Sequence, residues 1–258
     1  MRNVKSYHRP ESVKDALALL ARDDVVSAVL AGGTYLNARL PEDVEALIDL
    51  QAVGLDEVSH SPESMALGAM VRLQQIVEDD TAPALLREMA RREGPNTFRQ
   101  AGALGGAIMV ADPESEFVAA LLAYEAMVTV ETAGGAHTAP LDEFLAEIAA
   151  AETAAAGRQA ALRGGILTGV TLSTAGATAH ARVARTPQDS PIVAAIARRA
   201  GEGDIRLALC GVAPTPVLAQ EQDLNTLTPP ADFRGSSEYR REMAKVLAER
   251  VLREVRES

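Results

Sequence analysis

Two pairs of adjacent glycines in this chain could bind a phosphate group. The first pair, Gly32-Gly33, follows a short apolar segment at 27–30 and precedes a segment at 36–40 that could begin a helix. At such a strand-to-helix turn the backbone amides can point toward an anion, because glycine has no Cβ to cover them. Glycine pairs after strands also form simple tight turns, and the spacing here matches neither the Rossmann nor the P-loop pattern. This pair alone therefore leaves both interpretations open.

The second pair, Gly105-Gly106, lies between the small residues Ala103 and Ala107. Small residues let a ligand or another backbone segment come close, and they also let helices pack tightly. The second pair alone does not decide between these interpretations. Two glycine turns in a chain rich in Leu and Ala together predict a long, phosphate-bearing cofactor that is held from both sides.

The periodicity of apolar residues predicts the elements that must hold these glycines. We expect strands at 27–30, 46–50, 64–69, 126–131, 166–172, 178–183 and 205–212. We expect helices at 12–22, near Arg72, and at 81–93, 115–124, 190–200 and 236–256, with a partly helical segment at 141–163. The last helix should bury a stripe made of Tyr239, Met243, Val246, Leu247 and Val251.

The composition indicates a folded protein with a full core. Apolar residues make up 47% of the 258 residues and charged residues 24%, which is typical of a globular protein. The length favours two domains, and the expected boundary lies near Gly164-Gly165. A net charge of -11 without any cluster of Lys and Arg argues against a nucleic-acid partner.

The single cysteine, the spacing of the histidines and the lack of long apolar runs limit the kinds of site and the cellular compartment that we expect. The single cysteine, Cys210, cannot form an internal disulfide or ligate an iron-sulfur cluster alone. The first residues hold no apolar export segment, and no run approaches the roughly 20 apolar residues of a membrane helix. We therefore expect a cytoplasmic protein without a membrane span. The histidines lack the spacing of metal ligands, so we expect surface or structural roles for His8, His60, His137 and His180.

A series of segments resembles the FAD-binding subunit of molybdenum hydroxylases, the family of xanthine, carbon monoxide and related dehydrogenases. In chain order these are SYHRPESVKDALALL, VLAGGT, ALIDL, MALGAMVRLQQI, FRQAGALGG and ADPESEF. The segments RVARTPQDSPIVAAIA, LALCGVAPTPV and SSEYRREMAKVLAERVL resemble the family's C-terminal domain. The resemblance implies an α+β fold, with a two-part FAD-binding domain of the p-cresol methylhydroxylase type at 1–164 and a smaller C-terminal α/β flavoprotein domain at 165–258.

The same resemblance implies which residues bind the cofactor. The first glycine segment would wrap the FAD pyrophosphate and comprises Leu30, Ala31, Gly32, Gly33, Thr34 and Tyr35. The second would clamp it and comprises Ala103, Leu104, Gly105, Gly106 and Ala107. Glu116 stands where the family has an Asp that holds the ribose, and Arg182 where a Lys often approaches the flavin. Ile166 and Leu167 would contact the ring system. Alternatively, Glu116 is a solvated charge in the first turn of a helix, and Arg182 a surface or subunit-interface charge.

The second segment departs from the family pattern Thr-Ile-Gly-Gly-Asn, because Ala103 and Ala107 replace the Thr and the Asn. Tyr35 replaces a small or acidic residue. Each lost hydrogen bond to a phosphate costs on the order of 1.5 to 3 kcal/mol, so two losses would weaken FAD binding by roughly several hundred-fold or more unless backbone amides compensate.

The resemblance implies an FAD-dependent oxidoreductase subunit with an iron-sulfur small subunit and a molybdopterin-binding large subunit as partners. FAD would pass electrons from the iron-sulfur clusters to NAD, a quinone or another acceptor. No catalytic acid or base and no metal ligand is expected in this chain. The alternative, which the changes at Ala103, Ala107 and Tyr35 favour, is a structural subunit of the same complex with weakened or lost FAD binding. A second alternative is an autonomous flavin oxidase or reductase, although the sequence shows no residues that would activate an organic substrate.

Overall fold

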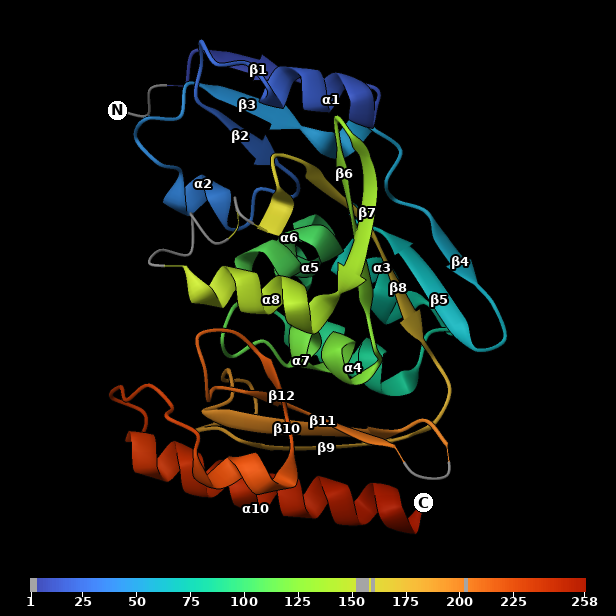
Figure 1. Cartoon of the computed structure of the whole chain (residues 1–258), viewed down its shortest axis with the longest axis vertical. Helices are drawn as coiled ribbons and strands as arrows, with labels where there is room; N and C mark the ends of the chain where they lie inside the picture. Colours follow the sequence, from blue (N-terminus) through green and yellow to red (C-terminus); the bar gives the residue numbers. More distant parts are fainter. Residues whose placement is uncertain (1–3, 152–157, 159–160, 202–203) are drawn as a thin grey trace.

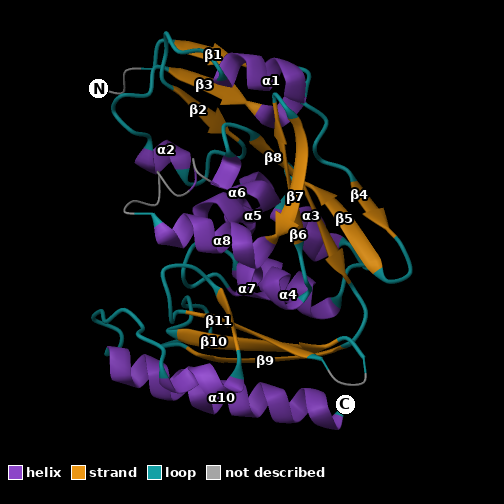
Figure 2. Cartoon of the chain, viewed as in Figure 1, coloured by secondary structure: helices purple, strands orange, loops and turns teal. Residues whose placement is uncertain are grey.

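The computed structural model describes residues 4–151, 158, 161–201 and 204–258 of the chain. The chain forms three layers: a three-stranded sheet at the N-terminal end, a middle layer with a five-stranded sheet and most of the helices, and a C-terminal layer with a four-stranded sheet (Figures 1 and 2). The α+β class predicted from the sequence is confirmed. Part of the expected helical segment at 141–163 lies outside the described residues. No helix in the described ranges is long and apolar enough to span a bilayer.

The N-terminal layer is a three-stranded parallel sheet that ends at the first glycine segment. Its strand order is β1-β3-β2, with β1 (Ser6–His8), β3 (Ala46–Asp49) and β2 (Ser27–Leu30). Helix α1 (Val13–Leu20) packs beside the sheet and begins at Ser12, whose side chain accepts a hydrogen bond from the Asp15 amide. Helix α2 (Leu36–Arg39) follows β2, and a short 3-10 helix, η1 (Leu50–Ala52), follows β3. The parallel strands therefore bring the end of β2 and Asp49 to the same sheet edge.

The middle layer contains an antiparallel sheet of order β4-β5-β8-β6-β7 and most of the helices. Its strands are β4 (Val58–His60), β5 (Ser64–Gly68), β8 (Ile166–Ser173), β6 (Met127–Thr132) and β7 (Gly135–Pro140). Its helices are α3 (Leu73–Glu78), α4 (Ala84–Arg92), α5 (Asn96–Ala101), α6 (Leu104–Val110), α7 (Glu116–Ala123) and α8 (Leu141–Ala150). All eight residues of α7 are buried, which explains why its sequence is apolar around most of its circumference.

The C-terminal layer is an antiparallel sheet of order β12-β11-β10-β9. Its strands are β9 (Ala177–Val183), β10 (Val193–Arg199), β11 (Ile205–Cys210) and β12 (Val217–Ala219), and a 3-10 helix, η2 (Glu221–Asn225), follows them. The long helix α10 (Ser237–Glu257) covers the outer face of the sheet, and α7 packs against the inner face (Figure 1). Strand β8 belongs to the middle sheet, so the chain enters the C-terminal sheet after Ser173. The domain boundary expected at 164/165 stays a prediction.

The helix predicted at 190–200 is wrong, because these residues form strand β10. Residues 193–198 are all buried, since β10 lies inside the sheet with α7 on one face and α10 on the other. A strand that is covered on both faces reads as a continuous apolar run, and such a run does not show the alternation that separates a strand from a buried helix.

The buried stripe of the last helix is also only partly as predicted. Leu247 and Val251 are buried, but Tyr239 and Val246 are exposed. Small side chains at Ala244 and Ala248 face the sheet instead, together with Leu252, Val255 and Arg240. The stripe is rotated because alanines let the helix backbone lie close to β10.

Candidate cofactor-binding site

The first glycine segment forms a sharp turn between β2 and α2, and each glycine is there for a different reason. Gly33 has a φ of +71°, in the left-handed region that favours glycine. At Gly32 an added Cβ would lie 1.7 Å from the carbonyl oxygen of Ala101, so no other residue fits without a shift of backbone. Thr34 at the tip is exposed, and the Arg39 guanidinium lies 4.4 Å above the centre of the Tyr35 ring.

The second glycine segment forms the N-cap and first turn of helix α6, whereas the sequence predicted only a glycine turn there. Two backbone hydrogen bonds fix it to the middle layer: Leu104 N–H donates to Val71 O at 2.9 Å, and Gly105 N–H donates to Ala69 O at 2.8 Å. The contact between Gly32 and Ala101 places the first glycine turn directly beside the segment that leads into α6. The structure therefore brings the two predicted segments together.

The two glycines of α6 differ in their surroundings. A Cβ added at Gly105 would lie 2.9 Å from the Ala69 Cβ and 3.2 Å from Leu167 Cδ2, so this glycine serves close packing. Apart from its chain neighbours and the backbone of its own helix, no atom of the described residues lies within 4 Å of a Cβ added at Gly106. Gly106 therefore faces open space, which a ligand could enter.

Several backbone amides in the two segments are left without a protein partner. Among the described residues, no acceptor receives a hydrogen bond from the N–H groups of Gly32, Gly33, Thr34 and Gly106. Unpaired N–H groups that cluster at a turn and at the first turn of a helix attract anions. By contrast, Ala107 N–H is engaged within the protein, where it donates to Ala103 O at 3.0 Å.

Apolar packing joins predicted cofactor-binding residues from three parts of the chain. Ala31 and the buried residues Ala103 and Ile166 belong to one hydrophobic cluster. Leu167 is buried on the other side of β8, in the main core, where it packs under Gly105. Ala103 is only 2% exposed, so its methyl group contributes to packing at the position where the family has a hydroxyl.

Glu116 and Arg182 form a second group with His180, at the other end of α6. Glu116 is 4% exposed, and its Oε1 lies 2.7 Å from His180 Nε2 and 3.1 Å from Arg182 Nε. The Arg182 guanidinium also donates to the backbone oxygens of Pro187 and Asp189. Glu116 is buried, so its interpretation as a solvated charge in a first helical turn is wrong. Arg182 is 13% exposed and paired, and a role for it at a subunit interface stays a prediction.

His180 was not predicted as a site residue, because the sequence indicated only a surface or structural role for it. On β9, residues 180 and 182 point to the same face because side chains alternate along a strand. That i, i+2 spacing of His and Arg was a usable signal, but nothing local showed that Glu116 would lie opposite.

The sequence analysis also missed Glu93, which follows α4 and whose carboxyl group points inward. Ser115 Oγ donates to Glu93 Oε2 at 2.9 Å. Burial raises the pKa of Glu93 to about 7, and the negative charges of Asp112 and Glu116 act in the same direction. Burial, followed by the charge of Glu116, raises the pKa of the Cys210 thiol, so Cys210 is an unreactive core residue.

Helix α6 separates the glycine segments from the Glu116 group. It has seven residues, which corresponds to about 10 Å at 1.5 Å per residue. An extended ligand that lies along α6 can therefore meet unpaired amides at one end and acidic and basic side chains at the other. Burial raises the pKa of Asp112, just after α6, and the nearby positive charges of Arg234 and Arg39 only partly oppose this rise.

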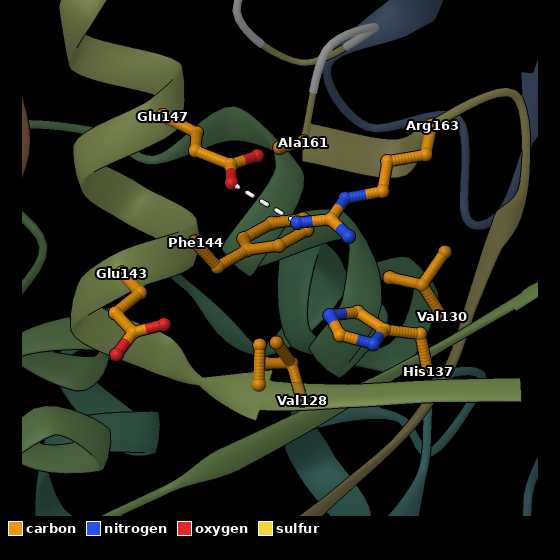
Figure 3. A pocket seen from close by; sticks show the side chains of 9 residues that line it. Val128, Val130, His137, Glu143, Phe144, Glu147, Ala161 and Arg163 are labelled. Carbon is orange, nitrogen blue, oxygen red and sulfur yellow. Dashed lines mark hydrogen bonds and ion pairs between the residues drawn. The ribbon is translucent and has the colours of Figure 1, made fainter.

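Two hollows elsewhere contain none of the predicted cofactor residues. A small cavity between the β6–β7 hairpin and α8 has a volume of about 40 Å³, and His137, Glu143, Glu147 and Arg163 face it (Figure 3). Glu147 and Arg163 form an ion pair across it at 3.4 Å. This volume suits about one water molecule. A larger groove of about 480 Å³ lies between α8 and residues 214–218, and its lining is mainly apolar.

A family model described as the FAD binding domain in molybdopterin dehydrogenase matches residues 2–172. The chain belongs to this family. A relative that spans almost the whole chain is the glyceraldehyde dehydrogenase medium chain of Sulfolobus acidocaldarius, which is 28% identical and covers 97% of this chain and 98% of its own length. The carbon monoxide dehydrogenase medium chain of Hydrogenophaga pseudoflava is 30% identical over 54% of this chain and 50% of its own length.

A solved structure agrees with the family assignment. The carbon monoxide dehydrogenase of Hydrogenophaga pseudoflava that lacks the Mo-pyranopterin moiety of its molybdenum cofactor contains a similar chain, with a TM-score of 0.83 and 25% identity. The match covers 99% of this chain and 98% of that chain. This chain is thus an FAD-binding oxidoreductase subunit of the molybdenum hydroxylase type, as the sequence resemblance predicted, and FAD is its cofactor.

Proposed function

We propose that this chain binds FAD along α6 and passes electrons through it, from the iron-sulfur clusters of a small partner subunit to an external acceptor. A large molybdopterin-binding subunit would hydroxylate the substrate. The medium-chain relatives and the molybdenum cofactor named for the carbon monoxide dehydrogenase support this arrangement. The observation that carries the proposal is the set of unpaired amides on two glycine segments that lie side by side, with open space in front of Gly106.

The proposed roles follow from the chemistry of each group. The N–H groups of Gly32, Gly33 and Gly106 would donate to the pyrophosphate. The Glu116 carboxylate would accept hydrogen bonds from sugar hydroxyls, and Arg182 would lie near the flavin ring. FAD supplies the electron transfer, and the protein binds it, orients it and sets its electrostatic surroundings.

Backbone amides can compensate for the side-chain hydrogen bonds that the second glycine segment lacks. Ala103 and Ala107 cannot donate a side-chain hydrogen bond, but the unpaired amide of Gly106 remains, and the first segment has further amides. We infer that the amides retain FAD with reduced affinity. The same two alanines favour the alternative of a structural subunit. That alternative predicts that the purified full-length chain stays colourless after FAD is added.

The test is an FAD titration of the full chain, followed by quenching of flavin fluorescence, with Gly106→Asp as the probe. Gly106 is helical and open, so an Asp fits the fold and suits the first turn of a helix, yet its charge would repel a pyrophosphate. Gly33→Asp is a poorer probe, because the left-handed φ of Gly33 makes any side chain strain the turn itself.

We expect saturable binding by the wild type and a dissociation constant at least about tenfold higher for Gly106→Asp, which corresponds to a loss of about 1.4 kcal/mol. Gly201→Asp is the matched control, since among the described residues it also has open space at its Cβ but lies in a bend of the C-terminal layer. Equal affinity of the wild type and Gly106→Asp would remove the pyrophosphate from α6. No binding, with or without partner subunits, would support the structural-subunit alternative.

A further inference from the structure

Ion pairs fasten both ends of α7 to the C-terminal layer. At its C-terminal end, Glu125 pairs with Arg198 and Arg206, each at 2.9 Å. Just before its N-terminal end, Glu114 pairs with Arg234, from the loop that precedes α10. The N-terminal end differs from the other in one respect: it carries Glu116, which the proposed function places at the cofactor.

The contact at Glu114 belongs to a chain of alternating charges. The Arg234 guanidinium donates to both carboxylate oxygens of Glu114, with Nη1 2.8 Å from Oε2. Its Nε also donates to Asp232 Oδ2 at 3.1 Å. Asp232 in turn pairs at 2.8 Å with Arg240, a residue of α10 that is only 2% exposed. A bidentate guanidinium pair fixes orientation as well as distance, so this chain ties α10 rigidly to Glu114.

Backbone contacts extend this tie to the rest of the segment at 112–116. Gly211 N–H donates to Pro113 O at 2.6 Å, and the Arg240 side chain donates to Gly211 O at 3.1 Å. The Glu114 amide donates to Asp112 Oδ1 at 2.9 Å. The segment is therefore held from the C-terminal layer on one side and by its own turn on the other.

We propose that Arg234 is a positioning residue for the cofactor: by gripping Glu114, it sets the place of Glu116 relative to α6 and the two glycine segments. This inference rests on the proposed binding of FAD along α6. Arg234 itself need not touch FAD. It acts through the segment 112–116, which also carries the pairs of Glu116 with His180 and Arg182.

A purely structural role makes a different prediction. If Arg234 only docks the C-terminal layer onto the middle layer, then removing an arginine partner at the other end of α7 should affect FAD to the same degree. Arg206→Gln is the control, because it removes one Arg–Glu pair between the C-terminal layer and a residue that flanks α7, while Arg198 keeps its own pair with Glu125. Arg206 lies on β11, and its partner Glu125 lies beyond the far end of an eight-residue helix from Glu114.

The experiment compares full-length wild type, Arg234→Gln, Glu114→Gln, the double variant and Arg206→Gln. For each we would measure the FAD dissociation constant well below the melting temperature, and the midpoint potential of the bound flavin at saturating FAD. General loss of stability does not change that potential in molecules that remain folded and loaded. We expect Arg234→Gln and Glu114→Gln each to raise the dissociation constant about tenfold, and the double variant to do no more than either single change, because both remove the same interaction.

Arg234→Lys tests whether the bidentate geometry of the pair with Glu114 matters. Lysine keeps the charge but cannot donate in a planar fork, so we expect only partial recovery of FAD affinity. Arg206→Gln should leave the dissociation constant within about twofold and the midpoint potential unchanged. The inference is overturned if Arg234→Gln and Arg206→Gln change both quantities equally. If instead the wild type binds no FAD, even with its partner subunits, the proposed function fails first and takes this inference with it.

Discussion

Glu93 carries a carboxyl group whose ionisation the fold opposes. Its ordinary pKa of 4.5 rises to about 7, chiefly because burial removes water from the carboxyl group. Between these values the folded state holds the proton more tightly than the unfolded state. The contribution of Glu93 to stability is therefore fully present below pH 4.5 and is lost as pH rises through 7, by up to roughly 3 kcal/mol. Glu93→Gln should match the wild type near pH 5 and be more stable near pH 8.5, as denaturant unfolding across this range would show.

Glu88→Gln is the matched control for that measurement, because Glu88 lies on α4, the helix that Glu93 follows, is partly exposed and pairs with Arg91 and Arg92. Its difference from the wild type should change little between pH 5 and pH 8.5. A difference between Glu93→Gln and the wild type that is equally independent of pH would show that Glu93 ionises normally, and the buried acid group beside Glu116 would then need another description.

At the scale of elements, the sequence analysis succeeded where the signal was local. The strand at 27–30, the glycine turn and the start of α2 follow from a short apolar run and the special conformation of glycine. The meeting of Glu116 with His180 could not be read in this way, because 64 residues separate them and only the packing of α7 on β9 joins them. Strand β10 was mistaken for a helix, because burial of both faces hides the alternation of side chains.

The contact between α10 and β10 gives a prediction at this scale. Ala248 is fully buried and shares a cluster with Ala195 and Ala197 of the strand, so there is no room for a larger side chain. Ala248→Leu should lower the free energy of unfolding by about 1 to 3 kcal/mol through overpacking. Val246→Leu places a leucine on the same helix at a residue that is 46% exposed, and should change it by less than about 0.5 kcal/mol. Equal losses of unfolding free energy for the two variants would contradict the burial of Ala248 and the exposure of Val246.

For the whole molecule, the C-terminal layer and the cofactor site should open together. Cys210 is the only cysteine, and its side chain is fully buried in the core that the C-terminal sheet shares with the helices of the middle layer. A thiol reagent can reach it only when the sheet separates from α7, and that step also separates Arg182 on β9 from Glu116 on α7. If FAD needs both residues, FAD must slow the labelling of Cys210.

The rate gives a quantitative test of this coupling. A ligand that binds only the closed form lowers the population of the open form by a factor of one plus the ratio of free ligand to dissociation constant. FAD at one hundred times its dissociation constant should therefore slow labelling about a hundredfold. With a dissociation constant about tenfold higher, Gly106→Asp should show only about tenfold protection at the same FAD concentration. Its labelling rate without FAD should equal that of the wild type. Labelling that proceeds at an unchanged rate while FAD stays bound would mean that the N-terminal and middle layers hold the cofactor alone, and that the C-terminal layer serves another purpose in the complex.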